Sequence, residues 1–201
     1  MWDTILHIEA DAMPVDQKLQ SLFKLKTIFE DCNLSKDSVY ARLLHRIGLY
    51  EYAVNKSYTK AIDLTKESIR INTSQNKGSS PWFAIKSYSN IGFYYNDVGL
   101  TDEALTYYDS AFRLYKKFPE RKDLIFDARK ARSTIFFARG DYQRCIEENL
   151  IGLQEATEVN DLSNKASFLI LNAQAYAVQG SFTNTVECAD SGFSIGKNLD
   201  D

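Results

Sequence analysis

Residues 88–111 read YSNIGFYYNDVGLTDEALTYYDSA, and this stretch decides the fold. Small and aromatic residues recur in it at helical spacing, and a glycine near its middle marks a tight turn. The positions that define the pattern are Tyr88, Ile91, Gly92, Tyr95, Gly99, Ala104, Tyr108 and Ala111. Small residues let two helices cross closely, and aromatic rings fill the space beside the crossing. The stretch therefore predicts two amphipathic helices joined by a short turn.

The same arrangement returns about every 40 residues along the chain, which defines an internal repeat. Two later copies contain Ser133, Phe136, Gly140, Cys145, Asn149 and Gly152, and then Ala173, Tyr176, Gly180, Thr185, Ala189 and Gly192. A looser upstream copy contains Leu44, Ile47, Gly48, Ala61 and Thr65. One helix pair cannot bury its apolar face alone, so consecutive pairs must stack. The repeat predicts an all-α fold, an α-α superhelix of about four to five helix pairs.

This repeat resembles the tetratricopeptide repeat (TPR) family, whose units carry a small residue, an aromatic, a turn glycine, and then alanine, aromatic and alanine. The match is fullest at Gly92, Tyr95, Gly99, Ala104, Tyr108 and Ala111. Other copies depart from the pattern. Cys145 and Thr185 replace the first alanine, Asn149 replaces an aromatic, and Lys56 stands near the expected turn glycine. Most of these residues are small, so close helix packing is still expected.

The resemblance covers residues 40–197 well and the first 35 residues poorly. The period here is about 40 to 44 residues against about 34 in the family, so each unit gains roughly one or two helical turns. Such long helices look like those of the peptide- and motif-binding relatives. The resemblance implies a TPR-like solenoid that forms one domain, within a fragment of a larger bacterial protein. Its expected parts are N-terminal helices in 1–35 and helix-pair repeats at 36–74, 81–118, 121–158 and 161–198.

Local signals place the individual helices. They are expected at 3–11, 16–32, 37–54, 58–73, 81–98, 101–117, 121–138, 141–158, 162–179 and 182–197. Ser35 or Asp37, Asp141 and Asp161 can cap helix starts, because their side-chain oxygens accept hydrogen bonds from free amides. The long polar connector at 72–80 is expected to be a plain loop or, alternatively, a point of contact.

Composition limits the classes of partner. The chain has 24 basic and 27 acidic residues and a formal net charge of −3, so no overall field gathers nucleic acid. It has no apolar run near the length of a membrane span and no secretion signal. We therefore expect no membrane insertion and a cytoplasmic location.

The sequence offers no recognisable catalytic chemistry. Its two histidines and three separated cysteines form no metal-ligand spacing, and no glycine-rich phosphate loop is present. The cysteines are interpreted as buried free thiols. Glu147 and Glu148 are interpreted as a solvated acidic pair. We expect neither an enzyme nor a cofactor.

A solenoid of this kind offers a concave surface lined by the first helix of each pair, where a peptide or partner helix can lie. Helical spacing predicts which side chains face it. The candidate groove residues are Arg42, His45, Arg46, Lys86, Asn90, Phe93, Asn96, Lys130, Phe137 and Gln174.

The first two repeats lean basic on this surface. Arg42, Arg46 and Lys86 form a patch suited to a carboxylate or an acidic motif, and His45 is expected to join it below about pH 6.5. Asn90 can hold the backbone of an extended peptide, while Phe93 can anchor an apolar side chain. The alternative is that these residues are ordinary solvated helix faces. Some members of the family use a clamp of polar and basic residues to bind the carboxyl termini of chaperones. The residues here do not match that clamp, so binding of this kind is disfavoured.

Two functions remain open at this stage. The first is an interaction module whose groove binds a protein or peptide segment. The second is a regulatory N-terminal segment of a larger enzyme, such as a caspase-like (CHAT) protease or a histidine kinase. The chain has no polar capping helix after Phe193, so we also expect either a longer parent chain or self-association through the uncapped end.

Overall fold

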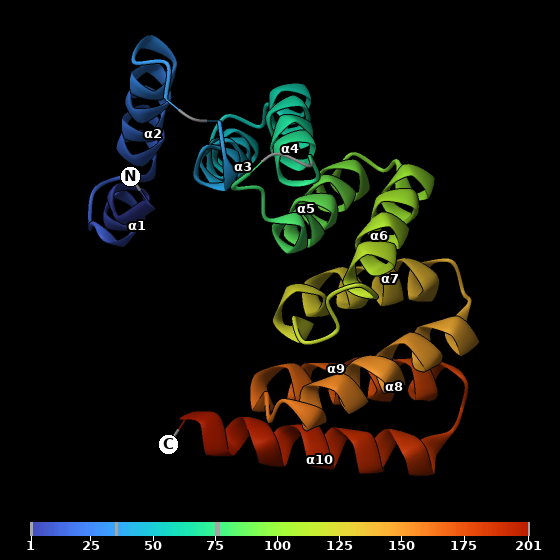
Figure 1. The fold of residues 1–201 in the computed structure, drawn as a ribbon. Coiled ribbons are helices and arrows are strands. Elements are labelled where there is room, and N and C mark those ends of the chain that lie inside the picture. The colour runs from blue at the N-terminus through green and yellow to red at the C-terminus, as the bar shows by residue number, and fades with distance from the viewer. Residues whose placement is uncertain (1, 35, 75–76, 201) are drawn as a thin grey trace. The chain divides into compact units, whose positions relative to one another are not determined.

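The computed structural model describes residues 2–34, 36–74 and 77–200 (Figure 1). Within these residues it contains ten α-helices, two short 3-10 helices and no strand. The all-α prediction is confirmed. The chain divides into two compact units, Met1–Phe118 and Pro119–Asp201. The predicted organisation as one continuous domain stays a prediction.

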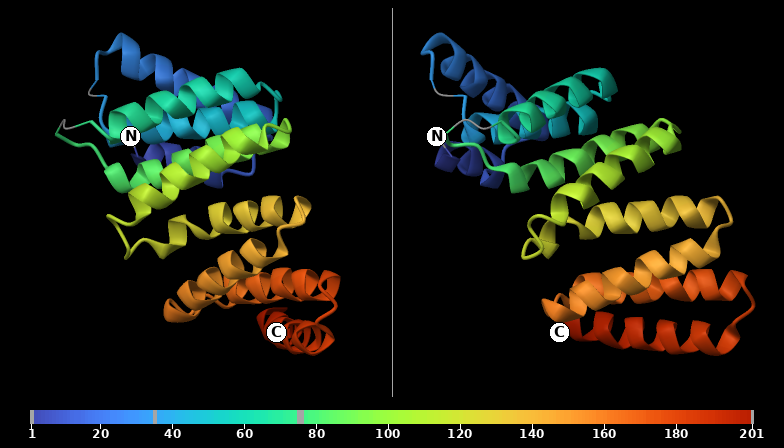
Figure 2. Two further views of the ribbon diagram at one scale, coloured as in Figure 1. Left: turned by 90° about the vertical axis from the view of Figure 1, so that its right-hand side faces the viewer. Right: turned by 45° about the vertical axis from the view of Figure 1, so that its right-hand side comes forward.

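The first unit consists of helical hairpins. Its elements are α1 (Trp2–Ala10), α2 (Val15–Asp31), α3 (Ser38–Ala53), α4 (Tyr58–Asn72), η1 (Pro81–Phe83), α5 (Ala84–Asp97) and α6 (Thr101–Tyr115). Helix α3 packs along α4 and α5 packs along α6, while α4 also contacts α5 (Figure 2). Stacked pairs thus bury the apolar faces that a single pair would leave exposed.

The second unit repeats this arrangement. Its elements are η2 (Lys122–Leu124), α7 (Phe126–Ala138), α8 (Tyr142–Glu158), α9 (Leu162–Val178) and α10 (Phe182–Asp200). Each helix packs against the next one along the chain. The helices predicted at 81–98 and 121–138 both begin later than expected, because the 3-10 helices η1 and η2 precede α5 and α7.

Caps and turns agree with the local signals. The Asp37 side chain accepts from the amides of Val39 and Tyr40, and Asp141 and Asp161 likewise cap α8 and α9. The other cap candidate, Ser35, lies outside the described residues. In the predicted turns, Gly99, Gly140 and Gly180 all adopt positive φ.

Lys56 takes the place of such a turn glycine and also adopts a positive φ, of 51°. A side chain with a Cβ is strained in this left-handed region, where glycine is not. The Lys56 ammonium lies 5.4 Å from the centroid of the Tyr52 ring, a contact that offsets part of the strain.

Helix crossings explain the small residues of the repeat. A Cβ placed on Gly92 would lie 2.5 Å from Cε1 of Tyr108, which is fully buried. Gly152 meets the buried ring of Phe168 in the same way. The glycines are therefore required by an aromatic ring that sits directly on the helix backbone.

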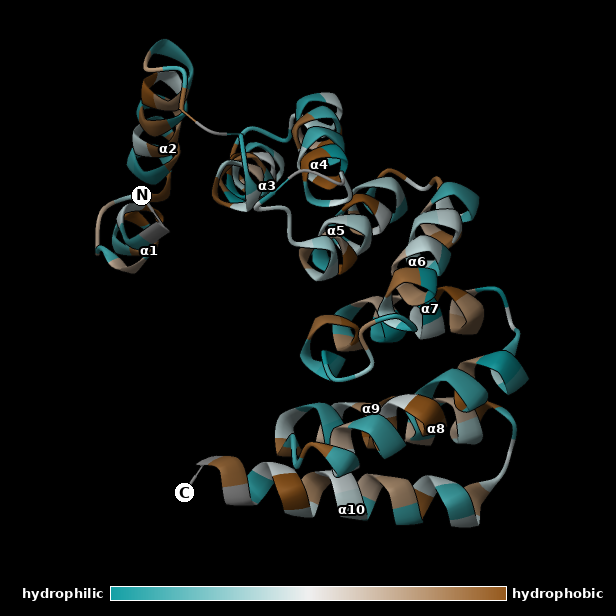
Figure 3. Ribbon diagram, viewed as in Figure 1, coloured by the Kyte–Doolittle hydropathy of each residue, from teal (hydrophilic) through white to brown (hydrophobic). Residues whose placement is uncertain are grey.

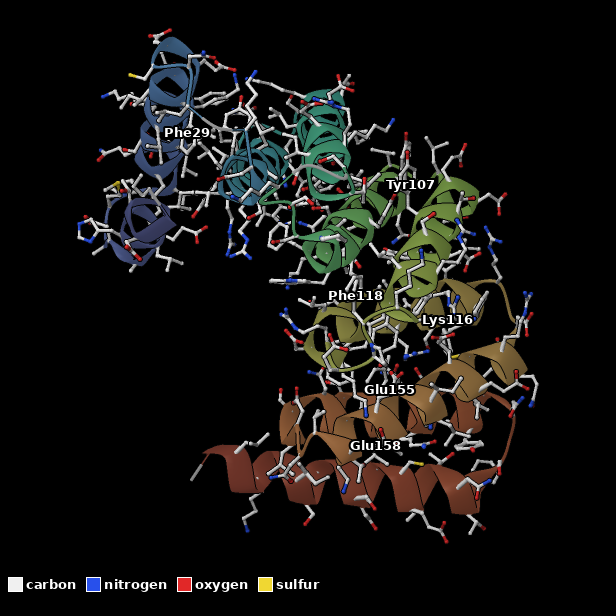
Figure 4. All side chains as sticks on the ribbon, in the orientation of Figure 1. Phe29, Tyr107, Lys116, Phe118, Glu155 and Glu158 are labelled. Atoms are coloured by element: carbon white, nitrogen blue, oxygen red, sulfur yellow. The ribbon has the colours of Figure 1, made fainter. Side chains whose placement is uncertain are left out.

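The N-terminal helices pack onto the repeat although its pattern is weak there. Phe29 of α2 (Figure 4) contacts Tyr40 of α3, with ring centroids 5.3 Å apart. The Tyr40 hydroxyl donates to Glu30 at 2.9 Å. Buried residues of α1, α2 and α3 form one apolar cluster.

The connector at 72–80 is tied down where it is described. The Ser80 amide donates to Oδ1 of buried Asn72, and the Ser38 amide donates to the carbonyl of Gly78. The connector is therefore held to the end of α4 and to the start of α3. Gln75 and Asn76, which also belong to the predicted loop, lie outside the described residues.

Candidate functional site

The structure brings His45 of α3 and Asn90 of α5 together. The amide of Asn90 lies 3.3 Å from Nε2 of His45, and the Oγ of Ser87 lies 2.9 Å from Nδ1. An amide nitrogen only donates, so Nε2 accepts and Nδ1 carries the proton that goes to Ser87. The Phe83 ring packs edge-on against the imidazole at 5.0 Å. We call His45, Phe83, Ser87 and Asn90 the His45 cluster.

The predicted protonation of His45 is wrong. Its side chain is buried, and burial together with the positive charges of Arg46 and Lys86 lowers its pKa to about 3. Burial disfavours the charged form of a histidine. His45 therefore stays neutral at physiological pH and joins α3 to α5 instead of adding charge to the surface.

Arg42 stacks on two aromatic rings of η1. Its guanidinium carbon lies 5.1 Å from the Trp82 centroid and 5.0 Å from the Phe83 centroid. These cation-π contacts restrict the rotamers of a long side chain. Sequence reasoning missed both rings, yet two aromatics directly after Pro81 were the signal that could have revealed them.

Arg46 pairs with a carboxylate from the N-terminal helices. Its Nε lies 2.9 Å from Oε1 of Glu9 on α1. Burial raises the pKa of Glu9, although the positive charges of Arg46 and Lys18 oppose this. The poorly matched N-terminal segment thus contributes an acidic residue to the basic patch, which the repeat pattern did not predict.

The remaining candidates of α5 are partly buried. The side chains of Lys86, Phe93 and Asn96 each keep part of their surface in solvent. Phe93 also packs edge-on against Tyr108, with ring centroids 5.8 Å apart. Phe93 is therefore part of the packing as well as a candidate anchor.

Three candidates lie in the second unit. Lys130 of α7 pairs with Asp127 at 3.2 Å, and Phe137 packs edge-on against Tyr142 at 5.4 Å. Gln174 of α9 is exposed. The groove predicted to join them with the residues of α3 and α5 stays a prediction, since each unit stands by itself.

The second unit also contains a charge network that the sequence reading missed. The Arg129 guanidinium donates to both oxygens of Glu155, at 2.9 and 3.0 Å, and also to Glu148. The Nε of Arg132 donates to Glu148 at 2.9 Å. Arg129 and Glu148 are each only 5 % exposed. We call these four residues the Arg129 network.

The interpretation of Glu148 as a solvated residue is therefore wrong, while Glu147 is exposed as expected. Residues 148 and 155 are two turns apart on α8, and 129 and 132 are one turn apart on α7. Opposite charges at these spacings on consecutive helices were the missed signal. The network holds α7 to α8 (Glu155 is labelled in Figure 4).

The cysteines differ from one another. Cys145 is buried, with its Sγ 3.2 Å from Oγ of Ser133, and burial raises the pKa of its thiol. Cys188 is partly buried and Cys32 is exposed, so the expectation of buried thiols fails for Cys32. Among the described residues, no group of three or more His, Cys, Asp and Glu side chains could hold a metal ion. In that same part of the chain, no helix combines the length and the hydropathy needed to cross a membrane.

No protein-family model matches the sequence. A search of curated proteins found no relative either. Solved structures do match. Aspartyl phosphate phosphatase F from Bacillus subtilis superposes with a TM-score of 0.80 at 12% identity, over 93% of this chain and 49% of that chain. The TPR-like repeats of a Podosopora anserina putative kinesin light chain give a TM-score of 0.69 at 15% identity, over 92% and 88%.

The chain has a TPR-like fold. This confirms the resemblance inferred from the repeat. A third TPR-like match is the Rap conjugation gene regulator of plasmid pLS20, in complex with a Phr peptide, at a TM-score of 0.68 and 13% identity over 93% of this chain and 50% of that chain. The chain thus spans about half the length of the phosphatase and of this regulator.

Proposed function

We propose that this TPR-like chain is a binding module without a catalytic step of its own, and that α3 and α5 hold a peptide or protein segment. The observation that carries the proposal is the cross-connection of these two helices by the His45 cluster, with Arg42 stacked beside it. A buried, fully paired histidine fixes the helices that display the basic side chains. The Rap regulator bound to a Phr peptide supports the proposal, since it shares the fold.

The proposed ligand carries carboxylates. Arg46 and Lys86 lie near the neutral His45, and Arg42 stacks on Phe83 of the same cluster. Guanidinium groups bind carboxylates through paired hydrogen bonds. Glu9 already occupies Arg46 at 2.9 Å, so an acidic ligand competes with it. Because the Glu9 carboxylate must be displaced from Arg46, weakly acidic ligands bind poorly and only strongly acidic ligands bind well.

The test is binding of an array of acidic, neutral and basic peptides to the full chain. Arg42→Glu and Arg46→Glu are expected to abolish retention of the acidic peptides, while Glu9→Gln removes the competing carboxylate and is expected to strengthen it. The matched control is Lys24→Glu, an exposed residue of α2. Circular dichroism confirms that each variant folds. Equal retention by the charge-reversed variants would exclude this surface.

A second proposal concerns α10. Phe182, Val186 and Phe193 are 75%, 57% and 74% exposed. Their spacing of four and then seven residues puts them on one side of the helix, and Figure 3 shows hydrophobic segments along it. Together they expose on the order of 400 Å² of apolar surface, a patch as large as those that mark interaction sites.

We propose that a second copy of the chain covers this face. Two such patches bury roughly 800 Å² in total, below the ~1,200 Å² of a stable interface, so the expected dimer is weak. Sedimentation velocity should show a mass that rises with concentration. Phe193→Asp is expected to remove the rise, whereas Leu150→Asp, a half-exposed residue of α8, leaves it unchanged. A constant monomer mass would refute self-association.

The alternative of a regulatory segment attached to a protease or kinase gains no support from the similar structures. Those structures are an aspartyl phosphate phosphatase, a Rap conjugation gene regulator and kinesin-light-chain TPR-like repeats.

A further inference from the structure

The first unit contains a pocket away from α3. Its volume is about 470 Å³, and it lies where α4 ends, beside the last turns of α6. The residues that line it are Thr73, Tyr88, Ser110, Arg113, Leu114, Lys116 and Lys117. Pockets of this size hold small molecules. We call it the basic pocket.

Three cations line one side of the basic pocket. Arg113 lies in the last turn of α6, Lys116 is the C-cap of that helix, and Lys117 follows in the turn, so the end of α6 brings all three to the pocket. All three are exposed, and Lys116 is labelled in Figure 4. Among the described residues, no carboxylate forms an ion pair with any of them. The chain as a whole is acidic, so this local charge is an exception.

Neighbouring hydroxyls complete the lining. Ser110 donates to the carbonyl of Thr106 and accepts from Nη2 of Arg113 at 2.7 Å, so it orients the guanidinium. Tyr88 is partly buried at the pocket wall, and burial raises the pKa of its hydroxyl, which therefore remains a hydrogen-bond donor. The Tyr88 ring and Leu114 supply an apolar wall.

A helix C-terminus ordinarily attracts a cation, because the last carbonyls carry partial negative charge. Three full positive charges exceed the partial charge of one helix end. The excess positive charge lies at a pocket that also contains the neutral hydroxyl donor of Tyr88 and an apolar wall. We propose that the basic pocket binds the diphosphate group of a small molecule, because a diphosphate carries about three negative charges at neutral pH and its oxygens accept from guanidinium, ammonium and hydroxyl groups.

A diphosphate can be free or attached to a larger molecule, and the probes separate these sources. Isothermal titration of the full chain at fixed ionic strength uses pyrophosphate, inorganic phosphate, AMP and ADP. Binding of pyrophosphate and ADP, with phosphate and AMP at least about ten-fold weaker, is the expected result. If ADP binds more tightly than pyrophosphate, the group attached to the diphosphate contacts the apolar wall. If the two bind equally, the site recognises the diphosphate alone.

Variants then locate the site. The double change Lys116→Gln and Lys117→Gln is expected to weaken pyrophosphate binding at least about ten-fold, and Tyr88→Phe to weaken it severalfold without changing the charge. Lys24→Gln is the matched control for loss of a surface charge and is expected to bind like the unchanged chain. The proposal is overturned if pyrophosphate does not bind, if phosphate and AMP bind equally well, or if the double variant and the control bind alike.

Discussion

Replacing Gly92 with alanine tests the close helix crossing on which the repeat depends. The added Cβ would lie 2.5, 2.7 and 2.8 Å from three ring atoms of Tyr108. That ring is fully buried and packed edge-on by Phe93, so it cannot swing aside. Overpacking of this kind costs about 3 kcal/mol, while alanine gains about 1 kcal/mol over glycine within a helix. We expect a net destabilisation of about 2 kcal/mol.

Urea unfolding followed by circular dichroism measures this change in the free energy of unfolding. Gly196→Ala is the matched control, because Gly196 also lies in a helix but its Cβ would meet nothing within 4 Å. That variant should gain about 0.5 to 1 kcal/mol. The double variant Gly92→Ala with Tyr108→Leu should couple favourably, since the smaller side chain leaves room for the methyl group. If Gly92→Ala is as stable as Gly196→Ala, the crossing does not require glycine.

Three further changes test other parts of the structure. His45 has a pKa lowered to about 3, so its contribution to stability is present above about pH 6.5 and is lost as the pH falls toward 3. His45→Gln should flatten this decline when the free energy of unfolding is measured by urea titration at several pH values. An unchanged pH profile would contradict a neutral, buried His45. Arg129→Met removes the guanidinium that pairs with both Glu148 and Glu155, and it should cost about 3 to 5 kcal/mol in the free energy of unfolding. The exposed Arg144→Ala should cost less than about 0.5 kcal/mol, and similar costs for both variants would count against the network. Lys56→Gly should raise the melting temperature, because glycine relieves about 1 kcal/mol of strain in the left-handed region. A lower melting temperature would mean that the contact between Lys56 and the Tyr52 ring outweighs this strain.

The helices and the stacking were predictable because their determinants are local. Gly99, Gly140 and Gly180 mark turns through backbone freedom, and the alternation of small and aromatic residues marks crossings through volume. The N-terminal helices expected at 3–11 and 16–32 are also present, as α1 and α2, although the repeat pattern does not reach them. The start of α7 was missed, since a 3-10 turn and an α-helical turn use similar residues.

The candidate site was harder to predict, because its chemistry depends on contacts between distant residues. His45 was assigned a surface role from its helical position, but Ser87 and Asn90, more than 40 residues away, bury and pair it. Glu148 was assigned to solvent because the sequence around it on α8 does not reveal that Arg129 of the preceding helix lies opposite. Periodicity indicates which face a residue occupies but not which charge or ring lies opposite.

The hydrogen bonds on both sides of the imidazole have a consequence for recognition. With Nδ1 and Nε2 each engaged by α5, the helix that carries His45 has little configurational freedom left to surrender. An extended chain that settles across α3 and α5 would lose its own entropy, while the receptor would lose little. Affinity at this surface should therefore depend mainly on how stiff the incoming segment is, so that cyclised or proline-containing ligands have the advantage over flexible ones.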